Sequence, residues 1–256
     1  MAKEVIITAN KVKKRKITSR LVKISLLVLL LLLIILYIIL EIIYHEGRFT
    51  VTLDSNKSLE NGLAIFDSLN NSQGKRRLFA TPIKFMDNIS YKWLPENIDT
   101  EADGPHNGEN YIAYTFYVEN QGKDILHYWY EVIIDDVIKN VDEAIRIRIY
   151  RNGEDVTYAK RSSLGGDAEP NTVPFKDIKN AEGTIILEEV RDFQPMSMDK
   201  FTIVVWLEGD DPDCTDPLIG GELKMHMVIT EKHVEQSKEW KKWKVEKNKR
   251  RRKENR

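Results

Sequence analysis

The chain has 256 residues and a formal net charge of −1, with 39 Lys and Arg against 40 Asp and Glu. That length allows one membrane span and one domain of ordinary size that buries its own core. The charges are distributed unevenly along the chain. Residues 1–23 and 231–256 each carry a net charge of +7, so residues 24–230 carry −15. An acidic central part repels anionic polymers, so nucleic acid is excluded as its expected partner and divalent cations are favoured.

The chain contains a single cysteine, Cys214, which excludes an internal disulfide. The domain must therefore be stabilised by its core alone. Secreted animal domains commonly use disulfides, so one thiol favours a bacterial cell surface.

Residues 24–44 form an almost unbroken apolar run in which Ser25 and Glu41 are the clearly polar side chains. As a helix, this run would be roughly 32 Å long, which matches the roughly 30 Å hydrocarbon core of a bilayer. The run predicts a transmembrane signal anchor. It divides the chain into a basic segment (1–23), the span (24–44), a domain (45–230) and a basic tail (231–256).

The flanks of the span predict its orientation, because Lys and Arg near a span stay on the cytoplasmic side. Eight Lys and Arg precede the span against one acid, Glu4, and no cationic excess follows it. We expect the N-terminus to be cytoplasmic and the domain to be extracellular. A cleaved signal peptide is an alternative, although this run is long and ends in bulky residues. A buried helix of a soluble protein is a second alternative.

The first part of the domain predicts two strands and a loop. Residues 48–54 alternate polar and apolar side chains, which indicates a half-buried strand. Residues 78–86 look similar, but Pro82 restricts them to an edge strand or a bulge because proline cannot donate to a ladder. Residues 97–110 are rich in Asp, Gly, Asn and Pro, and we expect an exposed loop there.

The middle of the domain shows the clearest strand patterns. Residues 111–119 and 126–134 are dense in aromatic and β-branched side chains. The intervening Asn-Gln-Gly-Lys predicts a hairpin, with Gly122 able to take a positive φ. Residues 137–144 are better suited to a helical turn between two strands.

Residues 145–150 alternate isoleucine with arginine or tyrosine, so the three isoleucines should share one face of a strand. Asn152 and Gly153 then predict a tight turn, after which residues 156–159 can return as a strand.

The last part of the domain starts with residues 161–180, which are rich in turn residues and are expected to cover one end of the fold. Residues 184–190, 200–207 and 222–229 predict three more strands. About nine or ten strands with turns between them predict a mainly β fold. We expect an antiparallel β-sandwich, jelly-roll or immunoglobulin-like, after one N-terminal transmembrane helix.

The basic tail contains few aliphatic residues, so it is expected to be a solvated helix or disordered. Aromatic side chains beside lysines suit an anionic surface such as lipid headgroups or a wall polymer. The alternative is a solvated basic tail with no such contact. The residues that would make the contact are Trp240, Lys241, Lys242, Trp243 and Lys244.

Catalytic motifs are missing from the sequence. His45 and Glu46 begin a zinc-protease-like string that lacks the second histidine. There is no nucleophile elbow and no phosphate-binding loop, and the histidines are scattered. Cys214 has no histidine close in sequence, so an inert thiol is the favoured interpretation. We therefore expect a protein without catalytic residues.

An acidic loop, residues 206–221, is the one concentrated polar feature of the domain. Its density of carboxylates could hold calcium, although the spacing is not that of an EF-hand. Acids solvated in turns are the alternative interpretation. No other cofactor is expected. The candidate calcium ligands are Glu208, Asp210, Asp211, Asp213 and Asp216.

Two segments of the domain, YTFYVENQGKDILHYWYEV (114–132) and VVWLEGDDPDC (204–214), resemble the camelysin and TasA type of surface proteins of Firmicutes. The resemblance covers residues 49–229 and implies a jelly-roll-like sandwich at the cell surface or in a biofilm matrix. Some family members are metallopeptidases, but this chain has no matching zinc ligands. The apolar anchor and basic tail also depart from the family, which favours a tethered protein over a released fibre subunit.

The leading hypothesis is a non-enzymatic single-pass bacterial surface protein that presents an acidic β-sandwich for adhesion, envelope or biofilm-matrix assembly. It would contact the bilayer through residues 24–44. It could associate with itself or with another surface protein through strand edges. The alternatives are an extracytoplasmic hydrolase acting on peptide or cell wall, and an accessory subunit of a membrane complex.

Overall fold

The computed structural model describes residues 9–44, 49–54, 62–70, 73–162, 165, 168–176 and 183–231, with side chains in the helix described from residue 20 to residue 39. The chain forms two compact units, Met1–Glu46 and Gly47–Arg256. The tail residues Trp240, Lys241, Lys242, Trp243 and Lys244 lie outside the described residues.

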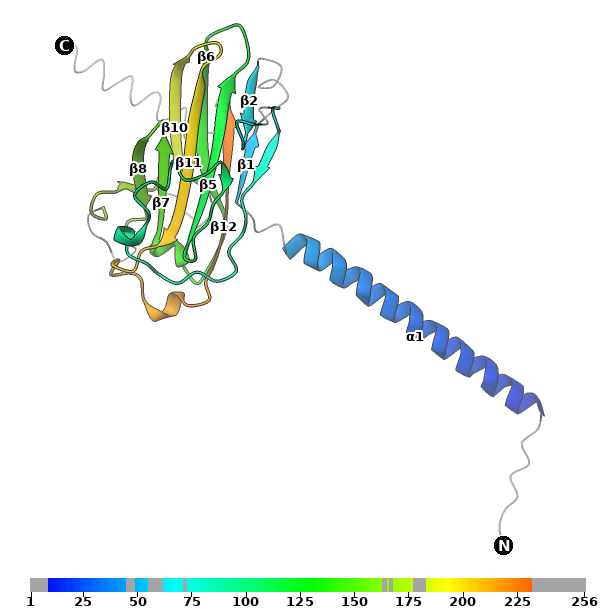
Figure 1. The fold of residues 1–256 in the computed structure, drawn as a ribbon. Coiled ribbons are helices and arrows are strands. Elements are labelled where there is room, and N and C mark those ends of the chain that lie inside the picture. The colour runs from blue at the N-terminus through cyan, green and yellow to red at the C-terminus, as the bar shows by residue number, and fades with distance from the viewer. Residues whose placement is uncertain are drawn as a thin grey trace, which may run out of the picture. The chain divides into compact units, whose positions relative to one another are not determined.

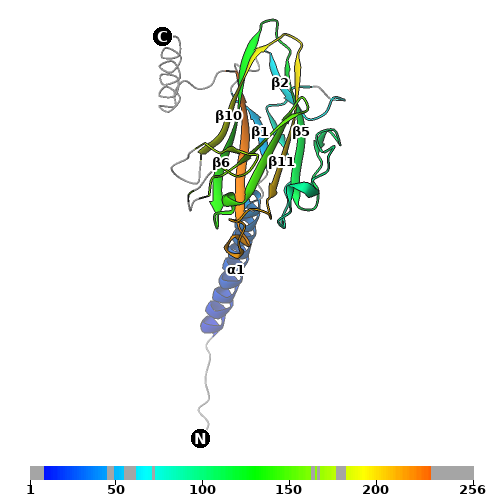
Figure 2. The same ribbon diagram turned by 90° about the vertical axis from the view of Figure 1, so that its left-hand side faces the viewer.

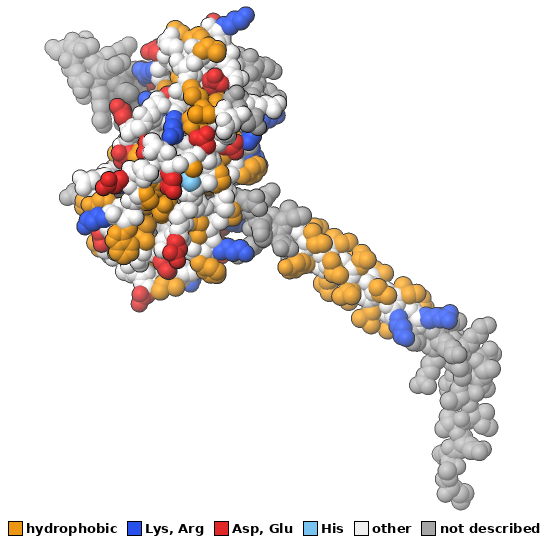
Figure 3. All heavy atoms as spheres, in the orientation of Figure 1, with side chains coloured by type: hydrophobic (Ala, Val, Ile, Leu, Met, Phe, Trp, Pro, Cys, Tyr) orange, Lys and Arg blue, Asp and Glu red, His pale blue; other side chains and the backbone are white. Residues whose placement is uncertain are grey.

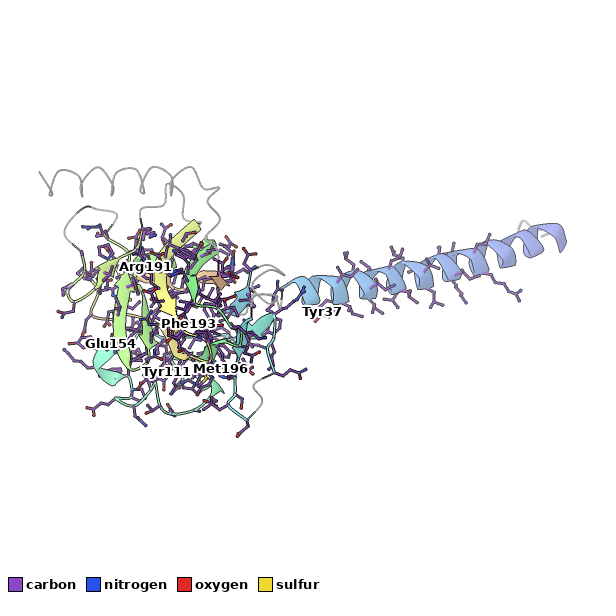
Figure 4. The ribbon with its side chains drawn as sticks, turned by 90° about the horizontal axis from the view of Figure 1, so that it is seen from above. Tyr37, Tyr111, Glu154, Arg191, Phe193 and Met196 are labelled. Carbon is purple, nitrogen blue, oxygen red and sulfur yellow. The ribbon has the colours of Figure 1, made fainter. Side chains whose placement is uncertain are left out.

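The first unit contains α1 (Ala9–Tyr44), a continuous helix of 36 residues. It begins inside the basic segment, because lysine and arginine are good helix formers and the leucine-rich run continues the same helix. Within it, Arg20–Ile39 has a mean hydropathy of 3.1 and is long enough to cross a membrane, a test that a signal sequence also passes. Its described side chains project from all sides, as Tyr37 does in Figure 4.

The second unit is a β-sandwich, and its described strands fall into two sheets (Figure 1). One, called sheet A here, has the order β10-β6-β12-β1-β3. The other, sheet B, has the order β2-β5-β11-β7-β8-β9, with β4 paired to β5. The strands are β1 (Thr50–Leu53), β2 (Leu63–Phe66), β3 (Arg77–Phe79), β4 (Gly104–Pro105), β5 (Tyr111–Asn120), β6 (Leu126–Ile138), β7 (Ile145–Arg151), β8 (Glu154–Ala159), β9 (Val173–Pro174), β10 (Gly183–Phe193), β11 (Met198–Leu207) and β12 (Glu222–Thr230). In the part of the chain that the structure describes, three short 3-10 helices accompany them, η1 (Tyr91–Trp93), η2 (Val141–Glu143) and η3 (Asp216–Leu218).

The prediction of a mainly β sandwich is confirmed, but both sheets are mixed rather than purely antiparallel. β1 runs parallel to β12, with Thr50 opposite His226, and β8 runs parallel to β9. Short turns impose antiparallel pairing, whereas a parallel pair needs a long connection. Nearly the whole domain separates β1 from β12, so no turn constrains their relative direction.

Of the two predicted tight turns, one is confirmed and one is wrong. Asn152 and Gly153 have φ of 54° and 86° and join β7 to its partner β8. β5 and β6 do not form a hairpin, because β5 pairs with β11 in sheet B and β6 pairs with β10 and β12 in sheet A. Gly122 does not adopt a positive φ. Its N–H donates to Asn120 Oδ1 at 3.0 Å, so a side chain holds the crossing between the sheets.

Two expectations for the first part of the domain change, and one strand there was not expected. The strand predicted at residues 78–86 is shortened to β3, which ends before Pro82 at the edge of sheet A. β2 was not predicted, because its four consecutive buried residues show no alternation. The predicted exposed loop at residues 97–110 contains Ile98, which is fully buried, and it forms β4.

Between the sheets lies the inner core, built from aromatic and aliphatic side chains of both sheets. Phe201 of β11 stacks on Phe116 of β5, with ring centroids 5.2 Å apart, and meets the edge of Tyr130 of β6 at 5.3 Å. Tyr128 donates its hydroxyl to the buried Asp199 carboxylate, and burial raises the pKa of this phenol. The three isoleucines of β7 face this core, as the alternation predicted.

Sheet B is also covered on its other face. Residues 85–105, called the cover segment here, lie outside β5, as Figure 2 shows. Their buried side chains make a separate outer cluster with β5 and β11. Because both faces of β11 are covered, its residues Phe201–Trp206 are buried without interruption. The outer cluster comprises Ile89, Leu94, Ile98, Ala113, Val204 and Trp206.

Candidate interaction surface

The acidic loop begins by pairing with the cover segment. The Ile89 N–H donates to the Leu207 carbonyl at 2.9 Å, and the Gly209 N–H donates back to the Ile89 carbonyl at 2.9 Å. These bonds form an isolated parallel β-bridge between Ile89 and Glu208, directly after the end of β11. The loop that follows is therefore fixed against the cover segment.

Glu208 is buried and serves as an acceptor within this junction. Its carboxylate accepts the indole N–H of Trp206 at 3.0 Å and the backbone N–H of Tyr91 at 3.1 Å. The backbone N–H of Asp210 also donates to it, at 3.3 Å. A buried carboxylate needs such donors to offset its loss of hydration. Glu208 thus ties η1 to the end of β11.

Asp210 makes a second connection to the cover segment. The hydroxyl of Ser90 donates to its carboxylate at 2.8 Å, and the Lys92 ammonium lies 3.9 Å away. Asp210 is exposed, so the ion pair with Lys92 contributes little to stability. The hydrogen bond from Ser90 fixes where η1 starts.

Asp211 belongs to a different group of charged side chains. Its buried carboxylate contacts the Arg146 guanidinium, which also lies 3.4 Å from Glu169. Glu169, Asp211 and Asp213 bring one carboxylate oxygen each within 4.8 Å of one another. Burial, and then the charge of Asp211, raises the pKa of Glu169.

The five predicted calcium ligands do not come together as one group. Asp211 and Asp213 lie together with Glu169, which the sequence did not single out. Glu208 and Asp210 hold the cover segment, and Asp216 lies exposed in η3. Three carboxylates could offer oxygen ligands to a cation, but Arg146 already supplies positive charge there. Calcium binding itself stays a prediction.

The other candidate groups are used locally. Asn88 donates a side-chain N–H to Cys214 Sγ at 3.4 Å, and burial raises the pKa of this thiol, which favours its unreactive protonated form. His106 lies between the carbonyls of Ile98 and Gly104, and His226 contacts Asp135 at 2.8 Å. Among the described residues, these groups do not converge on Cys214.

The junction leaves large aromatic side chains in solvent. Trp93 is 73% exposed, Tyr91 is 47% exposed, and Phe85, in the same segment, is 89% exposed. Lys92 Nζ lies 5.6 Å from the centre of the Tyr91 ring. In Figure 3, hydrophobic side chains gather over the region where η1 lies, with charged side chains beside them. The sequence did not predict this surface, because a Tyr-Lys-Trp stretch occurs equally in segments that bury their aromatic residues.

Comparisons with known proteins leave the family open. No family model and no curated protein matches the chain. Two solved structures of the β-glucosidase from Kluyveromyces marxianus, one with glucose and one labelled with selenomethionine, are similar over 64% of the chain at 10% identity. Their TM-scores are 0.23 and 0.24, and the chain spans 15% and 16% of their lengths.

Proposed function

We propose that this chain is a non-enzymatic single-pass bacterial surface protein that presents an acidic β-sandwich for adhesion, envelope or biofilm-matrix assembly. The observation that carries the proposal is the junction between the acidic loop and the cover segment. It uses two acids, Glu208 and Asp210, to hold η1 in place while Trp93 and Tyr91 stay in solvent. An arrangement of this kind suits binding, because exposed aromatic side chains form contact surfaces.

The membrane part of the proposal rests on α1. Arg20–Ile39 is apolar enough to span a bilayer, and the eight Lys and Arg within residues 1–23 favour a cytoplasmic N-terminus. The acidic domain would then lie outside the cell, where the basic tail could contact anionic lipid or wall polymer. The resemblance to camelysin and TasA type proteins agrees with such a location.

Strand edges support an assembly role. In sheet A, β10 is an edge strand of 11 residues that pairs with β6, and β3 forms the opposite edge. An edge of this length can accept a strand from another copy or from another surface protein. Register shifts near both ends of β10 would limit that pairing to its middle.

Protease treatment of intact cells tests the proposal. The full chain carries an epitope tag before Met1, and protease should remove the domain while the tag stays protected inside the cell. A variant with Leu31→Arg and Ile34→Arg is the control, because two charges inside the span should release the protein from the membrane fraction. A protected domain, or a secreted form lacking residues 1–44, would contradict the single-pass topology.

A further inference from the structure

The exposed large side chains of the domain include three aromatic residues of the cover segment. Trp93, Tyr91 and Phe85 lie within nine residues of sequence, and the cover segment to which they belong packs its buried side chains on the outer face of sheet B. The Trp93 indole N–H has no hydrogen-bond partner among the residues that the structure describes. A tryptophan held in water in this way loses the favourable burial that its neighbours in the outer cluster obtain.

The backbone beneath these side chains is fixed. The Trp93 N–H donates to the Ser90 carbonyl at 2.9 Å, and the Ser90 hydroxyl donates to Asp210. Leu94, the next residue, is buried in the outer cluster, and Glu208 accepts the Tyr91 N–H. Binding of a partner here would therefore cost little conformational entropy, because the backbone of this chain is already ordered. This surface, made of Tyr91, Lys92, Trp93 and Asp210, is called the aromatic platform below.

Charge decides which partner fits the platform. Lys92 is paired with Asp210, and residues 84–96 contain one further lysine and two acids. Residues 84–96 and Asp210 together therefore carry two positive and three negative side chains. Phosphate-rich partners, anionic lipid included, would be repelled rather than attracted. A neutral partner with many hydroxyl groups meets no such penalty, and it can bond to both Lys92 and Asp210.

We propose that the aromatic platform binds neutral polysaccharide. The C–H groups on one face of a sugar ring carry small positive charge and lie well on the negative face of an indole or phenol ring. Trp93 supplies the stacking ring, while Asp210 accepts and Lys92 donates hydrogen bonds to sugar hydroxyls. This inference rests on the proposed function and names the partner class through which a surface protein would adhere.

Affinity electrophoresis of the full chain in phosphatidylcholine nanodiscs tests the inference. Native gels contain dextran, soluble starch or mannan, and at least one of these should slow the protein. Trp93→Ala should weaken the apparent affinity roughly five- to tenfold, which corresponds to the loss of one stacking contact. Trp93→Phe should restore most of it. Phe79→Ala is the matched control, because Phe79 is a half-exposed aromatic residue on β3 of the other sheet.

The outcomes separate this inference from the proposed function. No retardation by any of the three polysaccharides, or equal retardation of Trp93→Ala and the original chain, would overturn it. Trp93-dependent binding to phosphatidylglycerol vesicles alone would assign the platform to lipid, and Trp93-dependent self-association alone would assign it to a second copy; either result also overturns it. A protein at the cell surface that ignores all three polysaccharides would lose this inference and keep the proposed function.

Discussion

The two faces of sheet B are covered in different ways. The inner face packs on sheet A through aromatic rings, as where Phe201 of β11 meets the edge of Tyr130 of β6. The outer face is covered by the cover segment, which is held by a small apolar cluster and by carboxylates of the acidic loop. Apolar packing on the inner face stabilises the whole domain, whereas polar contacts on the outer face fix the position of one surface. The acidic loop is therefore a positioning device in this fold.

Phe201→Ala should have the largest effect on stability. Phe201 is fully buried between two ring partners, and a cavity of this kind costs about 4 kcal/mol of unfolding free energy. Urea denaturation of the domain would measure the loss, and exposed Phe79→Ala should change it by less than about 0.5 kcal/mol. Equal losses for the two variants would mean that the inner face does not dominate stability.

Arg146→Met should have the next largest effect, because it leaves the buried Asp211 carboxylate without its cation. Removing one partner of a buried ion pair costs about 3 kcal/mol. The double variant with Arg146→Met and Asp211→Leu should recover much of this loss, since the fully buried Asp211 carboxylate is then removed together with its cation. Chemical denaturation measures both variants. A single variant as stable as the original chain would show that solvent already reaches Asp211.

Glu208→Gln should act locally on the cover segment. The amide keeps one acceptor oxygen but loses the charge that strengthens the bonds from Trp206 and Tyr91, at a cost of about 2 kcal/mol. Hydrogen exchange should accelerate in residues 85–105 and stay slow in β6 of sheet A. Uniform acceleration across both sheets would contradict the separate roles of the two faces. Asp216→Asn is the control, because Asp216 is exposed in η3.

The inner core should also weaken at alkaline pH. Burial, and then the charge of Glu188, raises the pKa of Tyr130 to about 12, above the value near 10 of an unfolded chain. Folding therefore favours the neutral phenol, so this contribution to stability is complete below pH 10 and is lost as the pH rises towards 12. Denaturation midpoints across this window should fall for the original chain and fall less for Tyr130→Phe. A flat profile would contradict burial of this phenol.

Several local features could be predicted from the sequence, and particular residues show why others could not. Asn152 and Gly153 predicted their turn because positive φ is a property of the residues themselves. The same reasoning failed at Gly122. Two consecutive strands that each bury one face can lie in different sheets as readily as they can pair in one sheet. β2 could not be predicted, because a strand whose polar and apolar side chains do not alternate resembles any short apolar run.

The candidate site shows the same limit more sharply. The density of acids in residues 206–221 can be read from the sequence. One of the hydrogen bonds that Glu208 accepts, however, comes from the backbone N–H of Tyr91, 117 residues away. Arg146 and Asp211 are 65 residues apart, and Glu169 joins them from a third segment. A carboxylate with buried donors and a carboxylate free to bind calcium look identical in sequence.

The sequence by itself determined the elements whose causes are local: the apolar helix, the alternating strands, the Asn-Gly turn and the mainly β class. Tertiary structure alone decided which strands share a sheet, that a predicted loop covers sheet B, and which acids are buried. Hydrophobic burial is non-directional, so a pattern of apolar residues specifies that a face is covered without specifying what covers it. The exposure of Trp93 follows from that same choice, because the cover segment buries Leu94 and Ile98 instead.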